Sequence, residues 1–442
     1  MRASETTTSP ESPRGETQPR EEPVGRPVPR SPLDLAPREP RGAATALDRS
    51  LARLLVEAVG RSVAVVLWDG REVRLGQDPT TRVHIDDRAA LLGLLLRPGL
   101  AFGDLYRDGR VHVEGDLVAG LERVYRAIQE RRRSLRIPRW LPRRGRAPSL
   151  ARSRHNIHRH YDLSNEFYAL WLDRAAMQYT CAYYPEAGLT LEAAQRAKME
   201  HVCRKVWLAP GERVIEAGCG WGGFALYMAR QYGARVRAFN ISHEQIRHAR
   251  AWAAREGLGG LVEFVEDDYR NITGHCDVFV SVGMLEHVGP GNYEELGRVV
   301  DRCLTREGRG LIHSIGRDSA APLNAWIRRR IFPGAYPPTL REMTRLFEPC
   351  GLSVLDVENL RLHYARTLEH WLERFERHAD RVRDRFDERF VRAWRLYLAG
   401  SVAGFRTGSL QLFQVVFART GGNRLPWSRE HVYADLRRAG PA

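Results

Sequence analysis

A glycine-rich loop between an apolar run and a helical segment constrains the fold more than any other feature of this 442-residue chain. The run Val214-Ile215-Glu216-Ala217 leads into Gly218-Cys219-Gly220-Trp221-Gly222-Gly223, and a helix-like stretch follows from Phe224. A strand, a tight turn and a helix in this order surround a small ligand with backbone N–H groups and a helix N-terminus. The sequence therefore predicts an α/β domain with a ligand at this turn.

The charge of Glu216 separates two classes of ligand. The spacing of Gly218, Gly220 and Gly223 also fits a dinucleotide fingerprint, so the glycines alone do not decide the ligand. A carboxylate two residues before the first glycine would repel a pyrophosphate and attract a cation. Glu216 therefore favours S-adenosylmethionine, whose amino group and sulfonium are cationic, over NAD.

Strands and helices alternate in the second half of the chain. Apolar runs predict strands at residues 213–217, 235–239, 262–265, 276–282, 310–315 and 410–418. A helix is expected over 243–255, where Ile246, Ala249 and Ala253 share one face, and a long helical region over 367–400. This alternation predicts a parallel sheet with helices on both faces and ligands at the carboxyl ends of its strands.

The composition divides the chain into four parts. Residues 1–43 are rich in Pro, Arg, Glu, Ser and Thr, which predicts a disordered and passive tail. Residues 44–130 predict a small α/β domain with helices at 51–56, 89–96 and 117–128, a strand at 63–68 and a hairpin turn at Asp69-Gly70. Residues 131–154 form an Arg/Pro-rich linker, and residues 155–442 form the predicted catalytic domain.

Charge and cysteine usage limit the cell compartment and the partners. The formal net charge of +15 favours acidic partners, either nucleic acid or an anionic lipid surface. The six cysteines lack CxxC pairs, which indicates a reducing compartment with neither a disulfide framework nor a zinc site. The chain has no membrane-spanning apolar run and no signal-peptide core, so a cytoplasmic protein that touches the membrane peripherally, at its inner face, is expected.

Four histidines argue against a metal site, and two segments leave alternative interpretations open. His155, His158, His160 and His201 match no tight ligand spacing, so no metal is expected. The arginine-rich linker is either a solvated hinge or a contact with anionic headgroups. The aromatic and arginine stretch at 324–337 either stacks on nucleic-acid bases or caps an apolar tunnel beside phosphate headgroups.

Polar residues follow each predicted strand at the expected ligand edge. Asn240 stands where an acidic residue usually holds a ribose, and an amide can both donate and accept hydrogen bonds. Asp268 and Tyr269 offer a carboxylate and a ring to an adenine. Glu286 and His313 follow the next two strands; singly, a salt-bridged carboxylate and a hydrogen-bonded core histidine are the simpler interpretations.

Seven separate motifs resemble the cyclopropane-fatty-acyl-phospholipid synthase family, to which mycolic acid methyltransferases also belong. The matches lie at 160–168 (His-Tyr-Asp-Leu-Ser-Asn-Glu-Phe-Tyr), 177–184 (Met-Gln-Tyr-Thr-Cys-Ala-Tyr-Tyr), the glycine loop, 240–245, 283–289, 313–316 and 363–368. The resemblance runs from about Ala44 to the C-terminus and is strongest from His155 onward. The small N-terminal unit resembles that of the phospholipid-acting enzymes and is absent from the free-standing mycolic enzymes.

The resemblance implies a class I S-adenosylmethionine-dependent methyltransferase core with a Rossmann-like sheet. The residues expected to bind the cofactor are Tyr179, Thr180, Glu216, Gly218, Cys219, Gly220, Gly222, Asn240, Ser242, Gln245, Asp268, Tyr269 and Arg270. It also implies a bound bicarbonate in a catalytic site formed by Cys181, Glu286, His313, Tyr364 and Ile315. Some relatives carry a cysteine where this chain has Ser401, which excludes a covalent cysteine mechanism at that position.

The resemblance predicts transfer of a methylene from S-adenosylmethionine to a cis double bond of an unsaturated phospholipid acyl chain. Bicarbonate would deprotonate the carbocation that methyl transfer leaves, so that the ring can close. Two alternatives stay open: a methylene- or methyl-branched fatty acyl product, and a nucleic-acid methyltransferase. No nucleic-acid recognition motif is present, so nucleic acid is not an expected partner. The expected partners are phospholipid acyl chains, an anionic membrane surface and a second copy of the chain.

Overall fold

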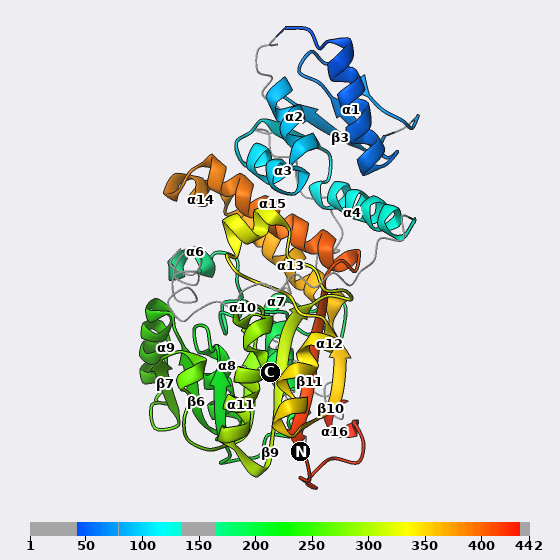
Figure 1. Ribbon diagram of the computed structural model, residues 1–442. Coiled ribbons are helices and arrows are strands. Elements are labelled where there is room, and N and C mark those ends of the chain that lie inside the picture. The colour runs from blue at the N-terminus through cyan, green and yellow to red at the C-terminus, as the bar shows by residue number, and fades with distance from the viewer. Residues whose placement is uncertain (1–41, 78, 135–163, 434–442) are drawn as a thin grey trace, which may run out of the picture.

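Two β-sheets organise the computed structural model, which describes residues 42–77, 79–134 and 164–433. The N-terminal unit has a four-stranded sheet in the order β2-β1-β3-β4, and the larger unit has a seven-stranded sheet in the order β10-β11-β9-β8-β5-β6-β7. In Figure 1 the blue and cyan N-terminal unit lies on helices α13 to α15, which in turn lie on one edge of the larger sheet.

The strands are β1 Val63–Val66, β2 Glu72–Val73, β3 Thr81–Ile85, β4 Val111–Glu114, β5 Arg213–Ala217, β6 Arg235–Asn240, β7 Val262–Glu266, β8 Cys276–Val282, β9 Leu304–Gly316, β10 Leu352–Asn359 and β11 Gln411–Arg419. The α-helices are α1 Ala46–Val59, α2 Arg88–Leu96, α3 Pro98–Arg107, α4 Leu117–Ser134, α6 Asn165–Ala169, α7 Leu191–Lys205, α8 Gly223–Tyr232, α9 His243–Arg255, α10 Leu285–Val288, α11 Tyr293–Cys303, α12 Leu340–Met343, α13 Arg361–Arg377, α14 Ala379–Arg385, α15 Glu388–Arg406 and α16 Glu430–Tyr433.

The larger sheet is mixed, so the prediction of a fully parallel sheet is wrong. Strands β9, β8, β5, β6 and β7 pair in parallel as predicted, but β11 pairs antiparallel with both β9 and β10. The reason lies in helices α13 to α15, which follow β10 and precede β11. The chain enters and leaves this helical insert at the same edge, so β11 must run back in the opposite direction.

Two other predictions about this unit needed correction. The helical region expected over 367–400 consists of three helices, and α15 starts anew where the Asp387 side chain accepts a hydrogen bond from the Phe390 N–H at 2.6 Å. Strand β10 was missed because it has no continuous apolar run: Asp356 and Glu358 interrupt its hydrophobic residues, and only Leu352 is fully buried, as expected of an edge strand. Helix α9 spans the predicted residues, with Ile246, Ala249 and Ala253 buried.

The N-terminal unit contains the predicted hairpin. Strand β1 pairs antiparallel with β2 and in parallel with β3, which the sequence reasoning missed together with α3 and β4. Helix α4 continues to Ser134, so the first four residues of the predicted linker, 131–134, are helical. The predicted tail up to residue 41 and the linker from 135 to 154 lie outside the described residues, and the division of the chain into four parts stays a prediction.

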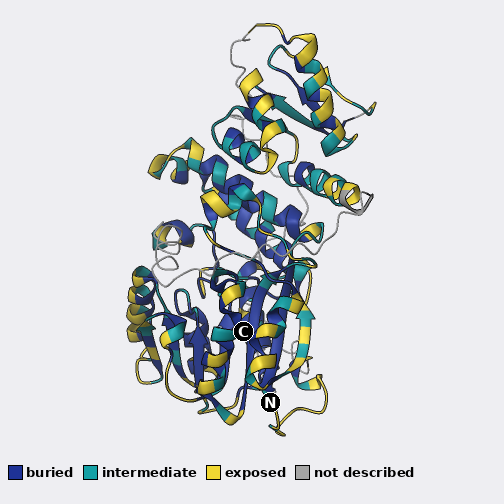
Figure 2. Ribbon diagram, in the orientation of Figure 1, coloured by how far each residue is buried: buried dark blue, intermediate teal, exposed yellow. Residues whose placement is uncertain are grey.

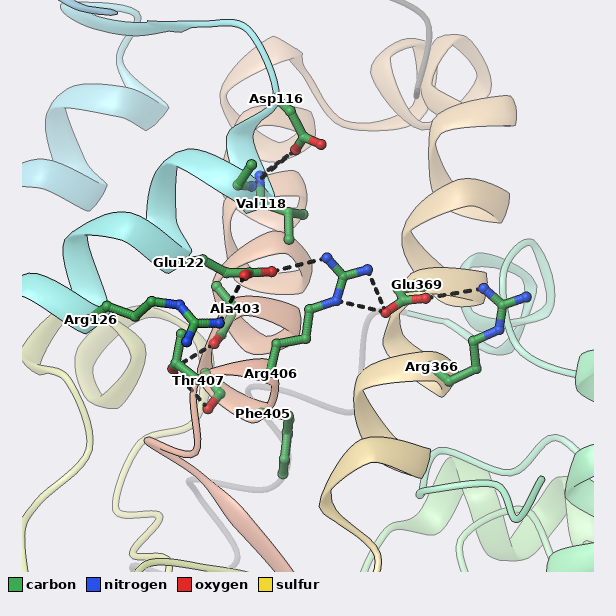
Figure 3. Close-up of polar contacts among 12 residues, drawn as sticks. Asp116, Val118, Glu122, Arg126, Arg366, Glu369, Ala403, Phe405, Arg406 and Thr407 are labelled. Carbon is green, nitrogen blue, oxygen red and sulfur yellow. Dashed lines mark hydrogen bonds and ion pairs between the residues drawn. The ribbon is translucent and has the colours of Figure 1, made fainter. Parts of the chain in front are cut away.

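Helix α15 joins the two units. Arg392 is buried and donates hydrogen bonds to the carbonyl oxygens of Tyr106 at 2.6 Å and Val111 at 3.0 Å. Figure 3 shows Arg406, near the end of the same helix, between Glu122 of α4 and Glu369 of α13. The two units therefore share polar contacts along the whole length of α15.

An aromatic cluster covers the edge of the sheet where the parallel strands end. Trp171 lies 5.2 Å from the Tyr179 ring and 5.5 Å from the Trp371 ring, and Tyr168 lies 4.9 Å from the Trp221 ring of the glycine loop. Figure 2 shows buried residues along the central strands and in the helices above them. Among the described helices, none combines the length and the apolar character that a membrane crossing requires.

Candidate functional site

The glycine loop forms a tight turn between β5 and α8. The N–H groups of Gly218 and Cys219 both donate to the carbonyl of Phe239, at 2.9 and 3.1 Å. Gly222 caps α8 with a φ of 88°, and a Cβ there would lie 2.6 Å from the Phe264 ring. Gly220 also has a positive φ. The predicted turn is therefore present, and its N–H groups and the N-terminus of α8 meet at the carboxyl end of β5.

Glu216 is a buried acid with an unsatisfied oxygen. Its Oε2 has no hydrogen-bond partner among the described residues. Burial raises the pKa of Glu216 to about 8, and the charge of Lys198 opposes this shift only in part. A buried carboxyl in this state is costly unless a cation reaches it, so Glu216 fits the cationic end of a ligand.

The residues after β6 brace the turn and leave one donor free. The Asn240 side-chain nitrogen donates to Gly220 O at 3.2 Å and to Gln245 Oε1 at 2.7 Å, and its oxygen accepts from the Ser242 N–H. Ser242 caps α9 through the Gln245 N–H. Because the Asn240 amide is engaged within the turn, the unpartnered polar atom here is Gln245 Nε2.

The residues after β7 present an aromatic hydroxyl. Asp268 and Arg270 form an ion pair at 3.1 Å, and the Arg270 guanidinium lies 4.8 Å from the centre of the Tyr269 ring. The Tyr269 hydroxyl is buried without a hydrogen-bond partner in the described chain, and burial raises its pKa. Asp268 and Arg270 thus hold each other, and Tyr269 is the group of the three that remains available to a ligand.

The segment that carries Tyr179 and Thr180 lies against these strand ends. The Tyr179 hydroxyl is 2.9 Å from the Tyr397 hydroxyl, and Thr180 Oγ1 accepts a hydrogen bond from Lys198 at 3.0 Å. A Cβ added to Gly283, just after β8, would lie 2.8 Å from the Thr180 methyl. The segment therefore packs directly on the loop that leads to Glu286.

Three neighbouring strands thus have unsatisfied polar atoms near their carboxyl ends among the described residues: Glu216 Oε2 in β5, Gln245 Nε2 after β6 and the Tyr269 hydroxyl after β7. A carboxylate, an amide donor and a tyrosine suit the amino acid end, the ribose and the adenine of S-adenosylmethionine. The residues of this structure therefore fit that donor.

Glu286, on α10 just after β8, belongs to a second group of polar side chains at the same edge of the sheet. Its Oε1 accepts a hydrogen bond from the Ile315 N–H at 2.6 Å, whereas its Oε2 has no partner among the described residues. Burial raises the pKa of Glu286 to about 7. The simpler interpretation as a salt-bridged carboxylate does not hold among the described residues, because the bonded oxygen of Glu286 accepts from a backbone N–H and no arginine or lysine pairs with it.

His313 presents a single proton to this cluster. The Gln414 amide nitrogen lies 3.1 Å from His313 Nδ1, which makes Nδ1 the acceptor and leaves the ring proton on Nε2. Nε2 is buried and has no partner in the described part of the chain. Burial holds the pKa of His313 well below its usual value, so the ring is neutral at physiological pH. A neutral ring with a free N–H can donate to an anion.

Short backbone contacts bring Cys181 and Tyr364 to the same region. The Cys181 sulfur lies 3.9 Å from Leu360 O, and the Tyr364 N–H donates to that carbonyl at 3.1 Å. Leu360 N donates to Leu412 O, and Leu412 pairs with Ile315 in the sheet. The five residues expected at the anion site therefore belong to neighbouring segments. Burial raises the pKa of Cys181, which keeps it a neutral thiol.

Other predicted features lie elsewhere or play structural parts. His155, His158 and His160 lie outside the described residues, as do the first four residues, 160–163, of the motif at 160–168. His201 pairs with Glu358 at 2.8 Å, and within the described ranges no group of three His, Cys, Asp or Glu could hold a metal. Ser401 donates to the Tyr397 carbonyl at 2.8 Å.

The aromatic and arginine stretch at 324–337 turns its large ring inward. Trp326 is buried against α3, where a Cβ on Gly103 would lie 2.3 Å from the indole, and Arg330 pairs with Asp104. Arg328 and Arg329 are exposed and form no ion pair with another described residue. A platform for stacking bases would need exposed rings, so this stretch does not favour nucleic acid.

Sequence reasoning missed two polar residues of the site, Lys198 and Gln414. Both side chains are fully buried, at 0 % exposure. Lys198 stands in the helical sequence Ala194-Gln195-Arg196-Ala197-Lys198, and Gln414 stands in an apolar strand. Each could have been identified as a polar residue at a position where the surrounding pattern predicts burial, because such residues are rarely buried unless they are paired.

Comparison with known proteins agrees with this geometry. The family model described as mycolic acid cyclopropane synthetase matches residues 149–415, and a domain of unknown function, DUF7884, matches residues 50–134. A "Probable fatty acid methyltransferase" of Pseudomonas putida is 35% identical over 380 residues, which cover 83% of this chain and 95% of that protein. The "Cyclopropane-fatty-acyl-phospholipid synthase" of Escherichia coli (strain K12) is 41% identical over 272 residues, 61% of this chain and 69% of that protein.

A solved structure shares the same architecture. The crystal structure of mycolic acid cyclopropane synthase CmaA1 complexed with SAH and CTAB is 26% identical, with a TM-score of 0.57, and the match covers 60% of this chain and 98% of that one. The fold is that of a class I methyltransferase, and the chain is an S-adenosylmethionine-dependent enzyme. With a family model over more than half of its length and a relative matched almost end to end, this chain belongs to the mycolic acid cyclopropane synthetase family.

Proposed function

We propose that this enzyme converts a cis double bond of an unsaturated phospholipid acyl chain into a cyclopropane ring, with bicarbonate as the base. The observation that carries the proposal is a pair of buried atoms without a partner in the described chain: Glu286 Oε2 on α10, just after β8, and His313 Nε2 on the adjacent strand β9. Buried polar atoms without partners are rare in proteins and mark ligand positions. One acceptor and one donor together match a bicarbonate ion, which carries both a hydroxyl and anionic oxygens.

The two bound groups have separate tasks. When bound, S-adenosylmethionine supplies an electrophilic methyl group on a sulfonium, and bicarbonate supplies a small base. The side chain of Glu216 would hold the cationic end of the donor, while Gln245 and Tyr269 would orient its sugar and base. The aromatic cluster around Trp171 and Tyr179 keeps water away from the reacting edge.

Residues of the chain would also position the base that removes one proton from the added carbon. Ring closure requires a proton to leave the carbon that was added, because methyl transfer leaves a carbocation on the acyl chain. His313 Nε2–H and the Tyr364 hydroxyl would hold the anion by donation, and the Cys181 thiol would complete the wall. Glu286 would accept the bicarbonate hydroxyl proton in a hydrogen bond at Oε2, because its Oε1 is occupied by the Ile315 N–H.

The membrane-related parts of the proposal follow from charge and substrate. The acyl chains reside in a bilayer, and the net charge of +15 favours an anionic lipid surface. We therefore place the enzyme in the cytoplasm, peripherally bound at the inner face of the plasma membrane. A homodimer is part of the same proposal, and sedimentation of the full chain tests it.

A labelled-donor experiment tests the function. The full chain is incubated with methyl-labelled S-adenosylmethionine and either unsaturated phospholipid vesicles or RNA. We expect label in lipid only, a product heavier by one CH₂ unit, and NMR signals of ring protons. Label found only in RNA would overturn the lipid substrate.

The Pseudomonas putida relative supports a second product. Because a "Probable fatty acid methyltransferase" aligns over almost its entire length, a branched acyl product is the alternative. The methylene branch requires one further step, in which a hydride shifts from the methylated carbon to the neighbouring cationic carbon. The added methyl group then loses its proton to form an exocyclic C=CH2 double bond instead of a ring. Vinylidene proton signals in place of ring signals in the NMR spectrum would identify the branched product.

A further inference from the structure

Lys198 is the buried charge for which the proposed reaction has no use. It lies on α7 with 0 % of its surface exposed, although lysine is among the residues least often buried. Burial lowers the pKa of Lys198 to about 8. A buried ammonium persists only where hydrogen bonds and nearby charges compensate its lost hydration.

The hydrogen bonds of Lys198 end on the segment that lines both ligand positions. Its Nζ donates to Gln178 Oε1 at 2.5 Å and to Thr180 Oγ1 at 3.0 Å. Gln195, one turn earlier on α7, donates to the Thr180 carbonyl at 2.8 Å. Helix α7 therefore holds the segment 178–181 by two sets of hydrogen bonds. Gln195 bonds to the backbone of the segment, and Lys198 bonds to its side chains.

The segment 178–181 borders both the expected donor site and the expected anion site. Thr180 packs against Gly283 at the start of the loop to Glu286, and the next residue, Cys181, belongs to the expected anion site. The Lys198 charge also acts on both sides: it lowers the pKa of Glu216 and, after burial, that of His313. The titratable groups around the ammonium are Asp173, Cys181, Cys203, Glu216 and His313.

We propose that Lys198 is a positioning residue that fixes the segment 178–181 and supplies the positive charge that keeps Glu216 ready to ionise when the donor binds. The inference deepens the proposed function, and its donor-binding half rests only on the cofactor. A cation behind the site would favour the ionised forms of the acids that face the ligands. Its ammonium would act through Gln178, Thr180 and Glu216, without contacting the substrate.

Calorimetric binding of S-adenosylmethionine between pH 6 and pH 8 tests the proposal. Lys198→Met keeps the volume but removes the donor and the charge. We expect weaker binding at pH 7 and a displacement of the pH-dependent rise in affinity to higher pH, because each pKa unit that Glu216 gains weakens binding by about a factor of ten. Lys198→Arg retains the charge, and it should restore the pH profile of the wild type.

Lys205 provides the matched control on the same helix. It is also buried, but it pairs with Glu358 at 2.6 Å and has no contact with the segment 178–181. Lys205→Met should lower the melting temperature without moving the pH profile of donor binding. Equal effects of the two methionine variants would reduce Lys198 to an ordinary structural residue and overturn the proposal.

A second variant covers the case in which Lys198→Met does not fold. Gln178→Met removes one acceptor of the ammonium and leaves the charge in place, so we expect weaker donor binding with an unchanged pH profile. Unchanged affinity in this variant would contradict the positioning role. Because no lipid is present in these measurements, a wild type that binds the donor but makes no ring would refute the proposed function and leave this inference standing.

Discussion

Donor binding should release a proton from Glu216, and the structure sets the size of this effect. With the pKa of Glu216 near 8, about nine-tenths of the free enzyme carries the proton at pH 7. A cationic donor that requires the ionised carboxylate must displace that proton. The apparent affinity should therefore rise with pH, by about 50-fold between pH 6 and pH 8, which corresponds to about 2 kcal/mol.

The sign of this dependence follows from the direction of the shift. Burial favours the neutral acid. Lowering the pH therefore increases the fraction of Glu216 that is protonated and cannot pair with a cation. Lys198 is the nearby charge acting on Glu216, and the thiols of Cys203 and Cys219 stay neutral because burial raises their pKa values. Below pH 7 Lys198 stays mostly charged, because its pKa is about 8, so the glutamate itself should dominate the pH dependence there; towards pH 8 Lys198 titrates as well.

Calorimetry in buffers of different ionisation enthalpy measures both quantities. The wild type should release about 0.9 proton per donor bound at pH 7. Glu216→Gln should bind more weakly and show neither proton release nor a pH slope, while the exposed Glu186→Gln serves as the control and should match the wild type. A wild-type affinity that is flat between pH 6 and pH 8 would refute the assignment of Glu216 as the partner of the donor's charge.

Three further predictions concern the anion site and the two units. Glu286→Gln should reduce turnover at least a hundredfold with donor affinity nearly unchanged, because an amide removes the acceptor of the bicarbonate hydroxyl; single-turnover kinetics and calorimetry check this, and normal turnover would contradict the role. Arg392→Met should cost about 1–3 kcal/mol, since two buried carbonyls lose their donor; a lower melting temperature and faster proteolysis near Val111 are expected, and unchanged values would argue against this junction. Removal of the residues before Ala44 should leave turnover on vesicles within about twofold of the full chain, and a large loss would show that the tail is not passive.

The local architecture of the donor site could be predicted because it depends on short-range patterns. Strands 213–217 and 276–282 and helix 243–255 agree with β5, β8 and α9 residue for residue, since each combines a periodic apolar pattern with a clear stop signal. The mixed sheet could not be predicted in this way. Whether β11 runs up or down depends on where a distant helical insert returns, and no local pattern records that.

The candidate site shows the same division. Glu216 could be singled out because its position relative to the glycines has a chemical meaning. The engagement of Asn240 within the turn could not, because it depends on the carbonyl of Gly220 and the side chain of Gln245 meeting in space. Lys198 escaped notice for a similar reason: a lysine on a helix is normally solvated, and only the packed structure shows what it holds.

The three helices between β10 and β11 begin and end on one side of the sheet, and this gives the fold a modular lid. A different set of helices could replace them without altering the order of the strands or the glycine loop beneath, provided that it keeps Tyr364 of the anion site and Tyr397, which contacts Tyr179. Variation in chain length, branching or headgroup among the acceptors of such enzymes could then accumulate in this exchangeable cover while the methyl-donor chamber stays constant. Grafting residues 361–406 from a relative onto this scaffold should accordingly transfer acceptor preference and preserve the affinity for the donor.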